Sequence, residues 1–135
     1  MKVIVVTNNN SIRAEALNDQ VDYDIQYIDE IDVLAVLRSA RDLVHKGHKL
    51  LTHPLSGSVK PFESPYKSIA LNATVAALDM QSLQIIENAI AMATNFKKPS
   101  DHRVLTEKVL EDFKLIDSQL ITNALTSVKE EDLWQ

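Results

Sequence analysis

Side chains that could bind a small ligand gather in two stretches of this chain. Thr7, Asn8 and Asn9 directly follow a run of apolar residues, and a second polar set extends from Thr52 to Lys67. Their amide, hydroxyl, imidazole and ammonium groups donate hydrogen bonds, so they suit a small anion such as a carboxylate or a phosphate. The residues that we predict to bind this ligand are Asn8, Asn9, Thr52, His53, Ser56, Ser58, Lys60, Tyr66 and Lys67.

The second stretch contains a long loop, residues 53–65, that shows no helical pattern. Pro54, Pro61 and Pro65 restrict the backbone there, and Gly57 permits a turn. A loop of this length without structure of its own is often functional in a compact domain. The alternative is a rigid surface loop whose Ser and Thr side chains satisfy their own backbone.

Other kinds of site have weaker support. Neither the phosphate-binding pattern G-x-x-x-x-G-K-[ST] nor the dinucleotide-binding pattern G-x-G-x-x-G occurs. The histidines lack a metal-binding spacing, and there is no cysteine to assist them. His53 with Ser56 or Ser58 is an alternative pair of base and nucleophile, but no orienting acid stands at a diagnostic spacing. We therefore predict no metal and no cofactor, assign no catalytic residue, and leave open whether the protein is an enzyme.

The elements expected to position these residues alternate between strand and helix. Apolar or alternating runs at 3–6, 24–28 and 48–52 predict strands, and helical spacing predicts helices at about 12–17 and from Asp29 or Asp32 to about residue 46. Gly47 is a good residue to end the second helix in a left-handed conformation. A fourth strand at 66–71 has no crossover helix before it, so we expect it to run antiparallel beside the third.

These patterns predict an α/β fold of three layers. The expected sheet is mixed and four-stranded, in the order 2-1-3-4 with strand 4 antiparallel, and has helices on both faces and a long C-terminal helix. Ligands of open α/β sheets bind outside the carboxyl ends of the strands, where strand order reverses. We therefore expect Thr7–Asn9 and Thr52–His53 to share one rim of the sheet.

Two further helices are expected in the second half of the chain. Asp79 can cap a helix at about 80–96, and Ser100 can cap a last helix that reaches about residue 128. The main apolar stripe of the last helix contains Leu105, Val109, Phe113, Ile116, Leu120 and Ala124, whereas Leu110, Leu115, Ile121 and Leu125 lie partly off it. A helix that is apolar on two sides must bury a second face, so we expect either a homodimer through 100–128 or packing within the monomer.

Length and charge limit the remaining possibilities. With 135 residues the chain is expected to form one domain, with an α/β core at 1–98 and the C-terminal helix at 99–128. The net charge is −5, and basic residues do not cluster, so we expect neither nucleic acid nor a membrane as partner. The lack of cysteine fits a cytoplasmic location.

The central stretch from His45 to Pro61, HKGHKLLTHPLSGSVKP, and the segment from Ser64 to Ser68, SPYKS, resemble the GrdX family. Thr7-Asn8-Asn9 is similar to that family as well, and the resemblance extends to about residue 97. The resemblance implies a small protein that accompanies the glycine, sarcosine and betaine reductase systems of anaerobic bacteria. It carries no established catalytic residues to this sequence. Asn10 stands where many members are expected to have proline, and either residue can open a helix.

The resemblance and the residues together predict an accessory, non-catalytic protein of such a reductase system. It would bind or sense a small anionic ligand at the rim of the sheet, and reductase subunits are its expected partners. Because it has no cysteine, it cannot relay electrons through thiols. The first alternative is a small enzyme that acts on a carboxylate or a phosphate ester at the same rim. The second is a structural adaptor that docks through its last helix.

Overall fold

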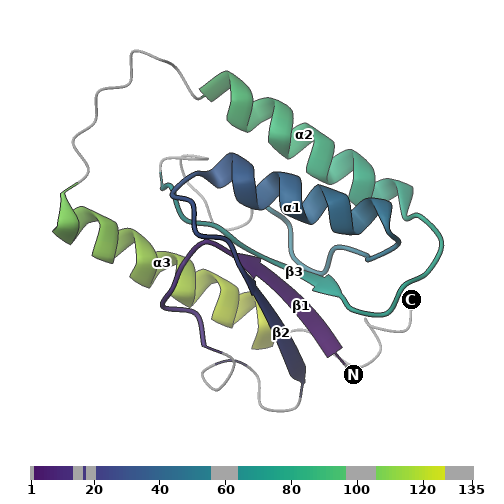
Figure 1. Ribbon diagram of the computed structural model, residues 1–135, viewed down its shortest axis with the longest axis horizontal. Coiled ribbons are helices and arrows are strands. Elements are labelled where there is room, and N and C mark those ends of the chain that lie inside the picture. The colour runs from purple at the N-terminus through teal and green to yellow at the C-terminus, as the bar shows by residue number, and fades with distance from the viewer. Residues whose placement is uncertain (1, 14–16, 18–20, 56–63, 97–105, 127–135) are drawn as a thin grey trace.

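The computed structural model describes residues 2–13, 17, 21–55, 64–96 and 106–126 (Figure 1). In chain order its elements are β1 (Lys2–Thr7), β2 (Asp22–Tyr27), α1 (Val33–His45), β3 (Ser68–Asn72), α2 (Met80–Phe96) and α3 (Glu107–Thr126). Among these residues, no helix is both long enough and apolar enough to cross a membrane.

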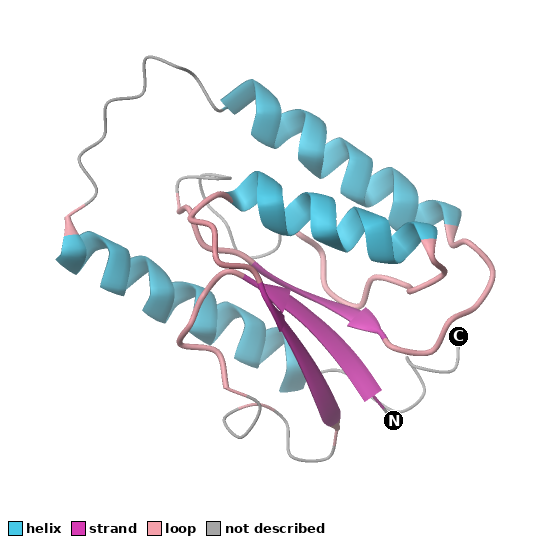
Figure 2. Ribbon diagram, in the orientation of Figure 1, coloured by secondary structure: helices cyan, strands magenta, loops and turns pink. Residues whose placement is uncertain are grey.

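The three strands form one mixed sheet in the order β2-β1-β3 (Figure 2). β1 runs parallel to β2, with Val5 opposite Ile25, and antiparallel to β3, with Val5 opposite Ala70. The central position of β1 agrees with its sequence, because an unbroken β-branched run is typical of a strand that is covered on both faces. All of its residues from Val3 to Thr7 are buried.

The predicted sheet of four strands in the order 2-1-3-4 is wrong. The described sheet has three strands, and the segment at 48–52 makes only one isolated antiparallel bridge, between Leu50 and Leu71. The strand predicted at 66–71 is β3, and it pairs directly with β1, the place that we had assigned to 48–52. The broader α/β assignment agrees with the structure.

Burial and competing hydrogen bonds explain this difference. Every residue of β3 is buried, so this short strand takes the covered position beside β1. The backbone N–H of Leu50 instead donates to the hydroxyl of Ser82 at the start of α2, at 3.0 Å. Leu51 and Thr52 both direct their N–H groups to the single carbonyl of Ala70, at 2.9 and 3.4 Å. The segment at 48–52 therefore lies along the outer edge of β3 without forming a regular ladder.

Side chains alternate between two cores on either side of the sheet, as the pleat of a strand requires. Ile4, Val6, Ile69 and Leu71 pack in one core, with buried residues of α1 and α2. Val3, Val5 and Ala70 pack in the other, with Ile121 and Leu125 of α3. Figure 1 shows α1 and α2 side by side and α3 across the sheet from them. α3 thus covers the face opposite to α1.

Both ends of α1 follow from local sequence signals. Asp32 caps its first turn, because its carboxylate accepts a 3.0 Å hydrogen bond from the N–H of Leu34. At the other end Gly47 has φ +104°, and its N–H donates to the carbonyl of Val44 while that of His48 donates to Leu43. These two bonds form the Schellman motif, which favours glycine at this position. The predicted roles of Asp32 and Gly47 are confirmed.

The remaining helices begin at hydrogen-bonding side chains as well. Asp79 accepts from the N–H and the hydroxyl of Ser82, at 3.0 and 2.6 Å, and so caps α2 as predicted. The N–H of Val109 donates to the hydroxyl of Thr106 at the start of α3, whereas the predicted cap Ser100 lies outside the described residues. The helix predicted at 12–17 falls partly on residues 14–16, which also lie outside them.

Candidate functional site

The candidate site lies at the edge of the sheet where β1 ends and β3 begins. Because β1 and β3 are antiparallel, Thr7 at the end of one strand is opposite Ser68 at the start of the other. α3 passes this edge and places Asp117 against both strands. Asp117 is only 7% exposed and shares its side of the helix with Ile121 and Leu125.

A chain of hydrogen bonds ends at the Asp117 carboxyl. The Ser68 hydroxyl donates to Oδ2 of Asp117 at 2.7 Å, and the hydroxyls of Thr7 and Ser68 are also 2.7 Å apart. Because the Ser68 hydroxyl donates its hydrogen to Asp117, the Thr7 hydroxyl must donate to the oxygen of Ser68. The oxygen of Thr7 in turn accepts a 3.0 Å hydrogen bond from the N–H of Asn9. All donors in this chain are thus oriented toward one carboxyl group.

Asn9 is fully buried, and its hydrogen bonds link α3 to the end of β1. Its side-chain amide donates to Oδ2 of Asp117 at 3.0 Å and to the carbonyl of Lys114 at 2.9 Å. Its side-chain oxygen accepts from the N–H of Ser11 at 3.0 Å. The amide of Asn9 is therefore occupied by the protein, and we assign it a positioning role.

Asn8 joins three segments that are distant in sequence. Its amide donates to the carbonyls of Glu30 and Pro65, each at 2.9 Å, and its oxygen accepts from the N–H of Lys67 at 3.0 Å. These bonds bring the end of β1 together with the approach to β3, so the asparagine cluster and the end of the proline-containing loop do converge. Asn8 too holds the site in place with groups that are already paired.

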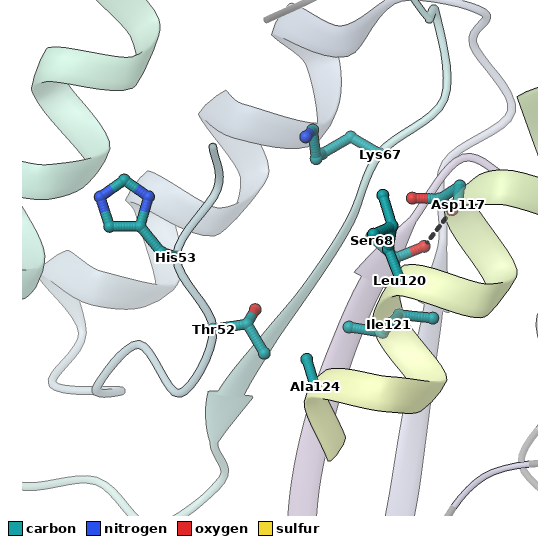
Figure 3. Close-up of a pocket in the computed structure, with 8 residues that line it drawn as sticks. All are labelled: Thr52, His53, Lys67, Ser68, Asp117, Leu120, Ile121 and Ala124. Atoms are coloured by element: carbon teal, nitrogen blue, oxygen red, sulfur yellow. Dashed lines mark hydrogen bonds between the residues drawn. The ribbon is translucent and has the colours of Figure 1, made fainter. Parts of the chain in front are cut away.

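A cavity of about 50 Å³ opens beside this network (Figure 3). In Figure 3, Lys67 and His53 lie on one side of it and Asp117 and Ser68 on the other. It is lined by Thr52, His53, Lys67, Ser68, Asp117, Leu120, Ile121 and Ala124. The polar groups come from the segment at 52–53, the start of β3 and α3, while the apolar part of the wall comes from α3 alone.

Burial shifts the pKa values of two groups in this wall, Asp117 and Lys67, toward the neutral forms. Burial raises the pKa of the Asp117 carboxyl, although the hydrogen bonds from Ser68 and Asn9 and the charge of Lys67 act in the opposite direction. Burial likewise lowers the pKa of the Lys67 ammonium, and the charge of Asp117 opposes that shift. Such paired shifts in a cavity are typical of functional sites, because the surrounding protein removes water from both groups.

His53 lies at the margin of this wall, and in Figure 3 its imidazole ring points away from Ser68 and Asp117. Its Nδ1 accepts a 3.0 Å hydrogen bond from the N–H of Leu55, so in the neutral ring the proton is on Nε2. The hydroxyl oxygen of Thr52 accepts from the N–H of Ala70 at 3.0 Å, which leaves its proton for another partner. His53 is exposed, whereas Thr52 is buried.

A second cavity, of about 210 Å³, shares Thr52 and His53 with the first. It lies toward the start of α2, between the segment at 49–53 and residues 79–85. Asp79 and Ser82 in its wall bond to each other, and Ser82 also binds the N–H of Leu50. Asp79 and Ser82 in this second cavity are therefore engaged in capping α2 and in holding Leu50.

The structure brings only some of the predicted residues to the cavity. Thr52, His53 and Lys67 line it, whereas Asn8 and Asn9 support it from behind. Tyr66 is buried, and the ammonium of Lys114 lies 5.5 Å from the centre of its ring. Ser56, Ser58 and Lys60 lie outside the described residues.

Sequence reasoning missed Ser68 and Asp117, as well as the role of Thr7. One signal for Asp117 was present, because it precedes Ile121 and Leu125 at four-residue intervals and so shares their helical face. The predicted stripe was displaced from this face by one residue: Ile116 is 51% exposed, while Asp117 is buried. A carboxylic acid on the buried face of a helix is itself a functional signal.

No group of three His, Asp or Glu side chains in the described part of the chain is arranged to hold a metal ion. The geometry thus defines an α/β protein with a small, charged cavity at the edge of its sheet.

A protein-family model described as GrdX-like protein matches residues 4–126. The chain belongs to the GrdX-like protein family. No match was found among curated proteins or among solved structures.

Proposed function

We propose that this protein is an accessory, non-catalytic component of a glycine, sarcosine or betaine reductase system, and that it binds a small anionic ligand in the cavity beside Asp117. Membership of the GrdX-like family supports the association with such a system. The observation that carries the ligand site is that the Lys67 side chain and the Thr52 hydroxyl, from two separate segments, line one cavity.

The donors in the wall match the chemistry of a carboxylate or a phosphate. The Lys67 ammonium supplies charge, and the Thr52 hydroxyl supplies a hydrogen-bond donor from a different segment. Burial weakens the hydration of Lys67, so an anion that pairs with it replaces missing water and favours its charged form. Asn8 fixes the backbone of Lys67 through the 3.0 Å bond to its N–H, which positions the cation before a ligand arrives.

Thermal unfolding in the presence of acetate, inorganic phosphate or acetyl phosphate tests the ligand site. Binding to the folded state raises the unfolding midpoint in proportion to the logarithm of the ligand concentration. We expect the rise in the wild type, a loss of it in Lys67→Met and a smaller rise in His53→Ala. Lys108→Met, a change at an exposed position of α3, is the matched control and should behave as the wild type. A midpoint that none of the three anions moves would reject the site.

A second candidate function, a small enzyme at the same rim, is favoured by one observation. The Ser68 hydroxyl donates to a buried carboxyl whose pKa is raised, in the wall of the cavity. A hydroxyl beside a carboxyl base is a possible nucleophile for an ester or a phosphate ester. Hydrolysis of a model ester or of acetyl phosphate by the wild type, lost in Ser68→Ala, would support this candidate over the non-catalytic one.

For contact with partners we propose α3 as the docking face. Leu115 and Ile116 are 59% and 51% exposed, on a side of the helix away from the sheet. Exposed apolar residues of this size that adjoin on one helix are typical of a contact surface. Affinity purification with the subunits of the reductase, with and without charged substitutions at these two positions, tests whether α3 is that face.

A further inference from the structure

The cavity proposed for an anion contains a feature that an anion alone does not explain. Asp117, a carboxylic acid, forms one of its walls. The two side-chain hydrogen bonds to its carboxyl, from the Ser68 hydroxyl and the Asn9 amide, both end on the same oxygen, Oδ2. In Figure 3 the other oxygen is directed away from Ser68, toward the side of the cavity on which Lys67 lies. An ionised Asp117 in this position would repel a simple anion.

The charges of the cavity are divided between its two sides. The cationic group and the imidazole belong to Lys67 and His53 on one side, and the acidic group belongs to Asp117 on the other. Each charge is only partly compensated by the protein, because burial disfavours the ionised form of both Lys67 and Asp117. A ligand with a negative charge at one end and a positive charge at the other forms charge-assisted hydrogen bonds with Lys67 and Asp117 at the same time. These bonds replace the contacts with water that both groups lose on burial.

We propose that the natural ligand of this cavity is a small zwitterion, a molecule with a carboxylate and a protonated amine separated by one or two carbon atoms. Its carboxylate pairs with Lys67, and its ammonium donates to Oδ1 of Asp117, the oxygen that is bonded neither to the Ser68 hydroxyl nor to the Asn9 amide. This inference rests on the proposed function, which it narrows from small anions in general to amino-acid-like ligands.

The size and the apolar wall of the cavity limit the ligand further. Its volume is about 50 Å³, and one water molecule needs about 10–15 Å³ of cavity. A molecule of about five non-hydrogen atoms fits that space. Leu120, Ile121 and Ala124 leave an apolar contact for a methylene group and no polar partner for a longer side chain. We therefore expect small amino acids to fit this cavity better than amino acids with large side chains.

Titration calorimetry with three small ligands tests the proposal on the unaltered protein. Glycine carries both charges, acetate carries only the carboxylate and methylammonium carries only the amine. We expect glycine to bind at least about tenfold more tightly than either fragment, since each end adds a charge-assisted hydrogen bond. Leucine, which has the same charged groups and a larger side chain, should bind more weakly than glycine. This series needs no variant and is independent of any effect on folding.

The variant Asp117→Asn tests whether Asp117 is the residue that contacts the ammonium group of the ligand. Asparagine keeps an oxygen that accepts from Ser68 and Asn9, so the fold should be retained, and circular dichroism checks it. Its amide cannot attract an ammonium, so glycine should lose its advantage over acetate, whereas acetate should bind as well as before or better. In Lys67→Met both ligands should lose binding, because the carboxylate partner is missing.

The possible outcomes separate this inference from the function on which it rests. Equal affinity for acetate and glycine, unchanged in Asp117→Asn, would overturn the zwitterion and leave the anion site standing. Absence of binding by acetate, phosphate and glycine alike would overturn both. Glycine binding that survives Asp117→Asn while acetate binds weakly would also overturn the inference, because another group would then hold the amine.

Discussion

The hydroxyl of Ser68 donates a 2.7 Å hydrogen bond to the carboxyl of Asp117, and this bond joins the first residue of β3 to the middle of α3. The same carboxyl oxygen accepts from the amide of Asn9, which follows β1. One acidic group therefore accepts hydrogen bonds from the start of β3 and from the segment that follows β1. It stabilises the attachment of α3 to the sheet and also forms a wall of the cavity.

Removal of this carboxyl should destabilise the fold. In Asp117→Ala the buried donors of Ser68 and Asn9 lose their acceptor, which costs about 1–3 kcal/mol for each buried group left unpaired. Asp117→Asn keeps an acceptor and should cost less than Asp117→Ala. Urea denaturation of both variants measures the difference in the free energy of unfolding. If the two variants were equally stable, the hydrogen bonds to this carboxyl would not hold α3.

Stability should also depend on pH through Asp117. Burial raises the pKa of this carboxyl in the folded state above the unfolded value of about 3.9. Between these two pKa values the folded state holds more protons than the unfolded state, so the free energy of unfolding falls as pH rises. The contribution is complete below about pH 3.9 and is lost as pH passes the pKa of the folded state.

The comparison with Asp117→Asn isolates this effect, because other titrating groups are common to both proteins. The stability of the wild type relative to the variant should decrease as pH rises above about 4, until pH passes the pKa of Asp117 in the folded state, with a slope of at most about 1.4 kcal/mol per pH unit. Urea denaturation at several pH values gives this difference. A difference that stays constant over the range would show that Asp117 titrates alike in the folded and unfolded states.

Asn8→Ala should weaken both the fold and the ligand site. The substitution removes two bonds that the amide donates, to Glu30 and Pro65, and one that its oxygen accepts from Lys67. We expect a loss of about 1–3 kcal/mol in the free energy of unfolding and weaker anion binding, because the backbone of Lys67 is no longer fixed. Asn10→Ala, at an exposed position of the same sequence, is the control. Equal stability of the two variants would contradict the positioning role of Asn8.

Gly47→Ala should be among the most destabilising single changes in the chain. Gly47 has φ +104°, a conformation that L-residues rarely adopt, and an added Cβ would collide with the carbonyl oxygen of Ala76. The N–H of Ala76 donates to Gly47 at 3.0 Å, so that neighbour cannot move away without breaking this bond. The conformational term alone is about 1–2 kcal/mol. Thermal unfolding checks the loss, and an unchanged midpoint would contradict it.

Local signals in the sequence were sufficient for most individual elements. The cap at Asp32, the stop at Gly47 and the cap at Asp79 each depend on a few neighbouring residues, and the structure contains all three. The arrangement of the strands could not be obtained in this way. The place beside β1 was decided by a hydrogen bond from Leu50 to Ser82 and by the burial of β3, both of which depend on contacts between distant segments.

The candidate site, too, could be predicted where it depends on local sequence but not where it depends on contacts between distant segments. The sequence suggested that Asn8 and Asn9 approach the end of the proline-containing loop, and the bonds of Asn8 to Pro65 and Lys67 have this effect. It did not reveal that both amides are occupied by the protein. Asp117 was missed because the register of α3 against the sheet is set by packing of Ile121 and Leu125, which a helical stripe alone does not fix.

The exposed apolar pair on α3, Leu115 and Ile116, leads to a prediction about assembly. We propose that two copies of the chain pair through this face when no reductase subunit is present, because each helix then buries apolar surface that water otherwise contacts. Light scattering after gel filtration should give twice the chain mass of 15.1 kDa for the wild type. The double variant Leu115→Glu/Ile116→Glu should give the mass of one chain, while Asn123→Glu, at an exposed polar position of α3, should still pair. A wild type that remains a single chain at all concentrations would contradict the dimer and leave a subunit of another protein as the partner for this face.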